Sequence, residues 1–158
     1  MLASNHYAVF VPNYELAPEA KYPTPLKQLD EFYRYVNSIQ GNYPLDMSQV
    51  FFAGDSAGAQ IASNYVAIQT NSELANQMEI GQAVASDSIK GALLYCGPYD
   101  IDKFNNSSHS IIMKFLLNQI AWSYIGKRTW QDTEPGKKAW EETLSFLKKY
   151  SVNVTESD

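Results

Sequence analysis

The decapeptide FFAGDSAGAQ, residues 51–60, places a short apolar run directly before a serine flanked by glycines. The run begins at Val50 and suits a buried strand, whereas the residues from Ala59 onward lack strand alternation and suit a helix buried over much of its surface. Between the two stands GDSAG, residues 54–58. Strand, sharp turn and helix in this order are what a Gly-x-Ser-x-Gly nucleophile turn requires.

Such a turn predicts that Ser56 is a nucleophile. A serine hydroxyl needs a base to take its proton and donors to receive the oxyanion, and the amide of Ala57 at the start of the next helix is the expected donor. We expect Gly54 and Gly58 to relieve clashes with the neighbouring strand or helix, and Asp55 to be a structural or electrostatic neighbour. The alternative is a glycine-rich strand-to-helix turn without reactivity.

Strands and helices alternate along the rest of the chain. Apolar runs predict strands at residues 7–11, 50–53 and 89–96, whereas helical periodicity predicts helices at 26–39, from 59 onward and at 111–125. The polar stretch 71–88 is interpreted as the end of a helix and a loop. Connections long enough to carry a helix imply right-handed crossovers, so the sequence predicts an α/β fold with a mainly parallel sheet flanked by helices.

Length and composition narrow the class of protein. The 158 residues fit a single domain, 1–158, and 45% hydrophobic with 18% charged residues is typical of a globular chain. A net charge of −5 without a Lys/Arg stripe argues against a nucleic-acid partner. No apolar segment approaches 18 residues, so we expect no membrane span.

The cysteine and histidine content suggests neither a disulfide nor a metal site. Cys96 is the single cysteine and lies in an apolar run, where we expect a buried thiol that behaves as a small hydrophobic group. A reducing compartment, the cytoplasm, is the simpler interpretation. Two histidines and one cysteine far apart in the sequence have no metal-ligand spacing, so no metal is expected.

Two motifs in the right order carry a family resemblance. NYELAPE at residues 13–19 is followed by YPTP at 22–25, and GDSAGA stands at 54–59. Over about residues 2–100, and more weakly beyond, the chain resembles the hormone-sensitive-lipase-like carboxylesterases and lipases of the α/β-hydrolase fold. The resemblance implies a three-layer sandwich, hydrolysis of a small-molecule carboxylic ester through an acyl-enzyme, and no cofactor.

The proton relay of that family is not evident in this sequence. The family's triad runs serine, acid, histidine, and its histidine-glycine-rich oxyanion loop does not precede the first expected strand here. His6 precedes that strand, away from the nucleophile turn, and is expected at the surface or at the edge of the core. His109 follows Ser56, and Asp100 or Asp102 could orient it, but a solvated or capping histidine is the default. The acid and base stay unassigned, with Asp100 and His109 as candidates.

The C-terminal part of the sequence lacks an expected strand. Residues 140–150 resemble the helix, and 152–155 the strand, that follow the acid-bearing strand in the family, yet no apolar strand precedes residue 140. We hypothesise that the chain is incomplete, with a segment missing near residues 139 and 140 and the histidine beyond Asp158. The alternative is one uninterrupted helix from Pro135.

Three functions remain open at this point. The first is an ester hydrolase, the second is an inactive remnant that serves as a binding or oligomerising module with an exposed sheet edge, and the third is a peptidase on the same fold. The aromatic residues within 103–131 suit either a lid over an acyl pocket or ordinary core packing. A homo-oligomer is also left open.

Overall fold

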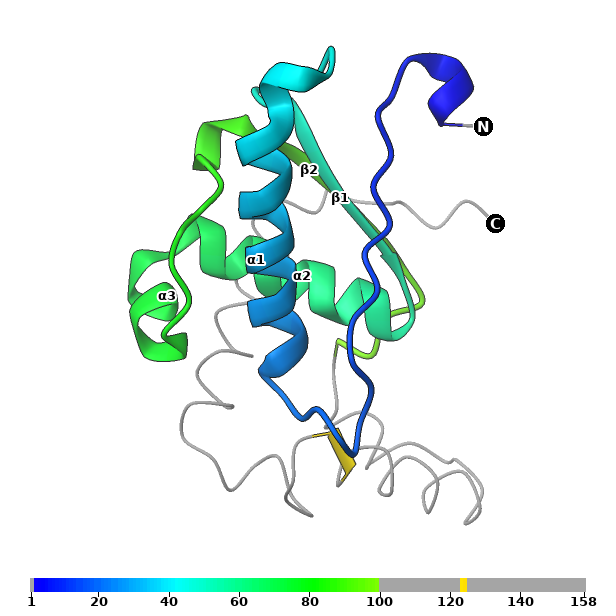
Figure 1. Cartoon of the computed structure of the whole chain (residues 1–158). Coiled ribbons are helices and arrows are strands. Elements are labelled where there is room, and N and C mark those ends of the chain that lie inside the picture. The colour runs from blue at the N-terminus through cyan, green and yellow to red at the C-terminus, as the bar shows by residue number, and fades with distance from the viewer. Residues whose placement is uncertain (1, 100–122, 125–158) are drawn as a thin grey trace, which may run out of the picture.

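The computed structural model describes residues 2–99 and 123–124, and every structural statement below concerns these residues (Figure 1). The helices are α1 (Thr24–Ile39), α2 (Ala57–Thr70) and α3 (Ser72–Met78), and the strands are β1 (Val50–Asp55) and β2 (Ile89–Tyr95). Short 3-10 turns occur at Ala3–Asn5, Gln40–Asn42 and Ser86–Ser88. The predicted α/β class is confirmed.

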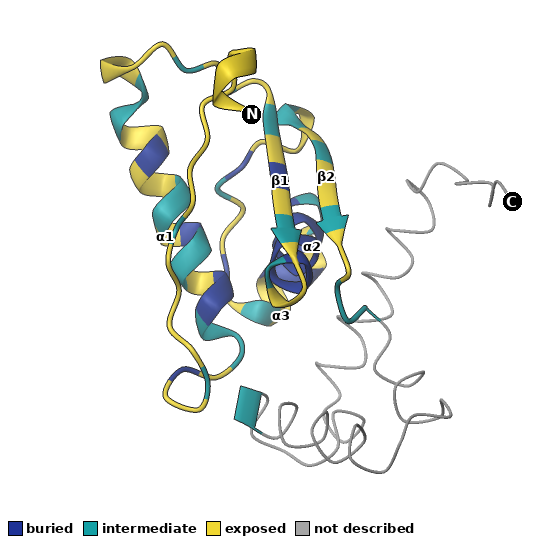
Figure 2. Ribbon diagram, turned by 90° about the vertical axis from the view of Figure 1, so that its right-hand side faces the viewer, coloured by how far each residue is buried: buried dark blue, intermediate teal, exposed yellow. Residues whose placement is uncertain are grey.

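The two strands form a parallel pair in which Phe52 lies opposite Ala92 and Asp55 opposite Tyr95. Parallel neighbours need a crossover connection, and α2 and α3 supply it between β1 and β2. Helix α2 packs against one face of the pair, where the Phe52 and Tyr65 rings meet edge to face with centroids 5.4 Å apart (Figure 2). The mainly parallel arrangement expected from the sequence is therefore present.

Helix α2 is the centre of the core. It carries no charged residue, and every position from Ala59 to Gln69 is buried, as the sequence predicted for this helix. Its companion α1 is amphipathic and turns Leu26 and Val36 inward. Burial of apolar side chains along both helices is the main favourable contribution to folding here.

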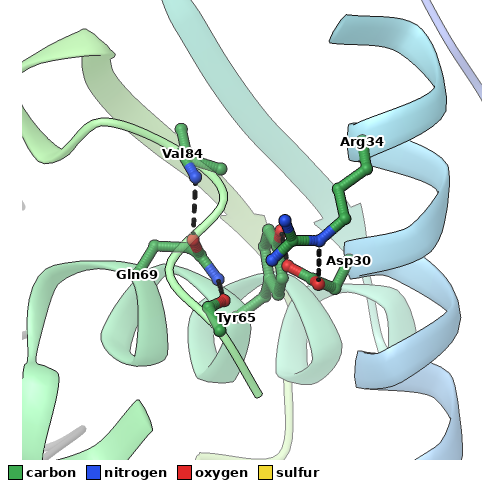
Figure 3. A network of polar contacts seen from close by, with 6 residues as sticks. Asp30, Arg34, Tyr65, Gln69 and Val84 are labelled. Carbon is green, nitrogen blue, oxygen red and sulfur yellow. Dashed lines mark hydrogen bonds and ion pairs between the residues drawn. The ribbon is translucent and has the colours of Figure 1, made fainter. Parts of the chain in front are cut away.

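A buried polar contact joins α1 to α2. Tyr65 Oη donates a 2.8 Å hydrogen bond to Asp30 Oδ1, and Arg34 Nε donates one of 2.8 Å to Asp30 Oδ2 (Figure 3). Tyr65 is fully buried and Asp30 is 8% exposed. Burial, and then the Asp30 carboxylate, raise the pKa of Tyr65 well above its ordinary value, so the phenol keeps the proton that it donates.

The stretch 71–88 was interpreted as the end of a helix and a loop, but α2 ends at Thr70 and residues 72–78 form a separate helix, α3. The Asn71 side chain accepts hydrogen bonds from the backbone amides of Glu73 and Leu74 and so caps the helix. Leu74 and Ala75 then turn into the core. The cap signal at Asn71 was present in the sequence, but the overall polarity of the stretch concealed it.

Gln69 fixes the segment that leads from α3 to β2. Its Nε2 donates to Gly81 O at 3.1 Å, and its Oε1 accepts from the backbone amide of Val84 at 2.9 Å (Figure 3). Gln82 Nε2 donates in return to Gln69 O at 2.9 Å. One buried amide thus holds the irregular backbone of residues 81–84 against α2, a few residues before β2 begins.

The strand predicted at residues 7–11 is wrong. This segment runs alongside α1 in an extended course without joining the sheet (Figures 1 and 2). Tyr7 meets Phe51 and Phe10 meets Phe32 through ring contacts, but the described residues offer the segment no backbone ladder. A strand depends on a paired neighbour as much as on composition, and Val11 stays 84% exposed.

Apart from the ring contact of Tyr7 with Phe51, no described element covers the face of the sheet opposite α2 (Figure 2). Phe51, Leu93 and Tyr95 are 47%, 45% and 60% exposed on it. The strand pair also has no further strand beside it among the described residues, because residues 7–11 do not join the sheet. Across residues 2–99 and 123–124, no helix is both long and apolar enough to cross a membrane.

We predict that Tyr65→Phe lowers the free energy of unfolding by about 1–3 kcal/mol. The ring packing on Phe52 survives this change, but Asp30 Oδ1 loses its buried donor. Urea denaturation followed by circular dichroism measures the effect. Tyr43→Phe removes an exposed hydroxyl and serves as the matched control, with no change expected. Equal stability of the two variants would contradict the assigned role of the Asp30 contact.

Candidate active site

Ser56 is the single residue between β1 and α2, and its backbone has an unusual conformation. Its φ of 51° and ψ of −116° are strained for any residue other than glycine. Its amide donates to Tyr95 O at 2.8 Å, and its carbonyl accepts from Gln60 N at 3.2 Å. The turn is therefore tied on one side to β2 and on the other to α2, with Ser56 itself exposed.

Gly54 permits this turn because there is no room for a side chain. A Cβ at this position would collide with the backbone carbonyl of Gly58 and the amide of Ala59. The expectation of a similar clash at Gly58 is wrong, since a Cβ there meets nothing within 4 Å. Gly58 lies in the first turn of α2 and faces open space, so only one of the two glycines is required by packing.

The start of α2 supplies the electrostatic setting of Ser56. Ala57 is the first residue of the helix, and the first-turn amides of a helix have no partner within it and carry the positive end of its dipole. Asp55, the last residue of β1, is exposed beside them. The suggested role of the Ala57 amide as an oxyanion donor stays a prediction, but the amide belongs to the element that the role requires.

The described residues bring no histidine to Ser56. His6 is exposed and follows the Ala3–Asn5 turn, which lies near the end of the sheet opposite the β1–α2 turn (Figure 1). The other candidates, Asp100, Asp102 and His109, lie outside the described residues. So do residues 139 and 140, the expected elements at 140–150 and 152–155, and all of the proposed lid region 103–131 except Ser123 and Tyr124.

Two residues after β2 were not singled out for this site. The expectation of a buried Cys96 thiol is wrong, because the chain leaves the sheet there with a φ of 50° and Cys96 is exposed. Tyr99 folds back over Gly97, where a Cβ would collide with the Tyr99 ring. Both residues follow β2, a parallel neighbour of β1, and the carboxyl ends of such strands lie at the same edge of the sheet. This position in the sequence was the signal that could have identified them as neighbours of the site.

A tyrosine contact lies beyond the same ends of the strands. Tyr22 N donates to Tyr124 O at 2.8 Å, and the two rings meet edge to face with centroids 5.9 Å apart. Burial raises the pKa of both phenols. The Glu15 and Gln28 side chains hydrogen-bond at 2.9 Å, which ties the 13–19 motif to α1. The loop that carries this motif thus lies at the foot of α1 (Figures 1 and 2).

Over the residues that the structure describes, no group of three His, Cys, Asp or Glu side chains is placed to hold a metal ion. A family model described as the alpha/beta hydrolase fold matches residues 2–158. The match includes the β1–α2 turn and continues through the region that holds Asp100 and His109.

We predict that Gly54→Ala destabilises the chain by about 3 kcal/mol or more, because its Cβ meets fixed backbone instead of a movable side chain. Gly58→Ala is the matched variant, expected to be neutral or to stabilise by up to about 1 kcal/mol, since alanine favours helix over glycine. Thermal or urea unfolding of both chains measures the difference. Similar losses at the two positions would contradict the packing described for this turn.

Proposed function

Because the chain belongs to the alpha/beta hydrolase fold family, we propose that it is a serine hydrolase of carboxylic esters that acts through an acyl-enzyme on Ser56. The single observation that carries the proposal is the exposed, strained backbone of Ser56 between β1 and α2. Strain of 1–3 kcal/mol, roughly, persists only where the surrounding structure imposes it, and such strain concentrates at functional sites.

The proposed chemistry begins with attack of Ser56 Oγ on the ester carbonyl carbon while a base takes the hydroxyl proton. The carbonyl oxygen then carries negative charge, which the Ala57 amide and the positive end of α2 stabilise. Collapse of this intermediate expels the alcohol, which receives the proton, and water releases the acid in the second half of the reaction. The base is a histidine oriented by a carboxylate, with His109 and Asp100 as the candidates within the sequence.

We propose that the substrate is a small-molecule ester and that the reaction takes place in the cytoplasm. A peptidase is the alternative reaction on the same site, because a fold fixes neither the acyl group nor the leaving group. Turnover of p-nitrophenyl acetate against an aminoacyl p-nitroanilide separates these two reactions. We expect the ester to be cleaved and the amide to be left intact.

The second candidate function is a binding or oligomerising module without catalysis. The uncovered sheet face with Phe51, Leu93 and Tyr95 favours it, because a bare apolar face of this kind marks an interaction surface. Light scattering would then report a mass above that of one 17.8 kDa chain, and Leu93→Ser would shift the mass toward the single chain. A homo-oligomer is compatible with either function, so the covalent test below decides between them.

We predict that a fluorophosphonate probe labels the folded chain at Ser56, because only an activated serine attacks phosphorus at a useful rate. Ser56→Ala should abolish labelling and lower p-nitrophenyl acetate hydrolysis by roughly 10³-fold or more, to the background rate. Intact-protein mass spectrometry and peptide mapping measure the label.

Ser86→Ala removes an exposed serine far from the turn along the chain and serves as the matched control, with labelling unchanged. A well-folded chain that takes up no probe would reject the hydrolase and leave the binding module.

A further inference from the structure

The described part of the chain contains two buried side-chain polar atoms without a hydrogen-bond partner, the hydroxyls of Tyr99 and Tyr124. An unpaired buried hydroxyl costs about 1–3 kcal/mol, so each such group calls for a physical reason. Tyr124 packs against Tyr22 and has Tyr14 nearby, in the loop beneath α1. Tyr99 has different surroundings, and they connect it to Ser56.

Tyr99 follows β2 at the point where that strand holds the Ser56 turn. Tyr95, the last residue of β2, accepts a hydrogen bond from the Ser56 amide through its backbone carbonyl and lies opposite Asp55 in the strand pair. Three residues separate Tyr95 from Tyr99, and the Tyr99 phenol interacts electrostatically with the side chain of Asp55, the residue before Ser56. The Tyr99 side chain therefore belongs to the neighbourhood of the proposed nucleophile.

The Tyr99 ring is held in place by the backbone beneath it. A Cβ at Gly97 would collide with the ring edge and the hydroxyl, so the phenol lies directly on this glycine. The Tyr99 amide also donates to Gly97 O at 3.0 Å, which closes the loop tightly. A ring fixed in this way presents its hydroxyl in one direction instead of sampling several.

Burial, more than the local charges, keeps this hydroxyl protonated. Burial raises the pKa of Tyr99, and the nearby Cys96 and Asp55 side chains act in the same direction. The Gly97 backbone acts in the opposite direction without meeting the geometry of a hydrogen bond to the hydroxyl. At neutral pH the group is thus a hydrogen-bond donor whose proton finds no acceptor among the described residues.

We propose that Tyr99 is a specificity-determining residue whose hydroxyl donates a hydrogen bond to an acceptor oxygen of the ester bound at Ser56. The inference rests on the proposed ester-hydrolase function and names its substrate class. Preferred esters carry an ether, hydroxyl or carbonyl oxygen within a few bonds of the scissile carbonyl. A plain hydrocarbon chain leaves the buried donor unpaired, and a site of this kind discriminates against ligands that lack the partner group.

The test compares two ligands of equal size that differ by one oxygen. Butyranilide and methoxyacetanilide are the phenyl amides of butyric and methoxyacetic acid, and the Ser56→Ala chain binds them without turnover. We expect methoxyacetanilide to bind about three- to tenfold more tightly, the ratio that one hydrogen bond supplies. Adding Tyr99→Phe should bring the two dissociation constants together. Adding Tyr35→Phe, which removes an exposed hydroxyl on α1, should leave the preference intact.

An unchanged preference after Tyr99→Phe would overturn the proposal, and so would the absence of binding by either anilide. Urea unfolding of the Ser56→Ala chain, with and without Tyr99→Phe, shows whether each chain is folded, and a folded chain makes the corresponding result decisive. Fluorophosphonate labelling separates this outcome from failure of the proposed function. Labelling at Ser56 without an anilide preference rejects only the role of Tyr99, whereas a preference without labelling rejects only the hydrolase.

Discussion

The close approach of α2 to β1 at Gly54 is the constraint on which the rest of the described structure depends. The backbone of Gly58 and Ala59 occupies the space that any side chain at residue 54 would need. The helix can therefore begin one residue after the strand ends, and that residue, Ser56, takes the positive φ. The hydrogen bond from Ser56 N to Tyr95 O then joins the turn to β2, so strand pairing and the strained conformation of Ser56 support each other.

The core behind this turn is specified by polar groups as well as by apolar ones. Helix α2 is buried along nearly its whole length, and apolar contacts alone would allow α1 and the segment before β2 to slide along it. Asp30 fixes α1 through Tyr65, and Gln69 fixes residues 81–84 through both ends of its amide. Each contact has a required geometry, which selects one packing among several of similar apolar area.

The fold was predictable from the sequence where the signals are local. The residues of β1, α2 and β2 have the periodicity and turn chemistry of their elements, so these three were recognised. Residues 7–11 have the composition of a strand, but pairing depends on a neighbour that composition does not reveal. Gly58 illustrates the same limit, since a motif cannot show which of its glycines lies against backbone.

The candidate site was predictable only in part for a related reason. Ser56 and Ala57 lie within one motif, whereas an acid and a base arrive from distant parts of a chain and are placed by tertiary structure. Tyr99 was not recognised because its relation to Ser56 passes through strand pairing between Asp55 and Tyr95. The position of Tyr99 after a parallel neighbour of β1 was the one available signal, and the buried hydroxyl without a hydrogen-bond partner singles the residue out in the folded chain.

The absence of charge along α2 has a consequence for the growing chain on the ribosome. Residues 57–70 emerge before residues 89–95, which form the second described strand of the sheet that α2 packs against. For the time that translation of the intervening stretch requires, about 1–5 s at 5–20 residues per second, this segment has no finished surface to cover it. In the interval before β2 is synthesised, the apolar surface of residues 57–70 is therefore available to other newly made chains and to chaperones.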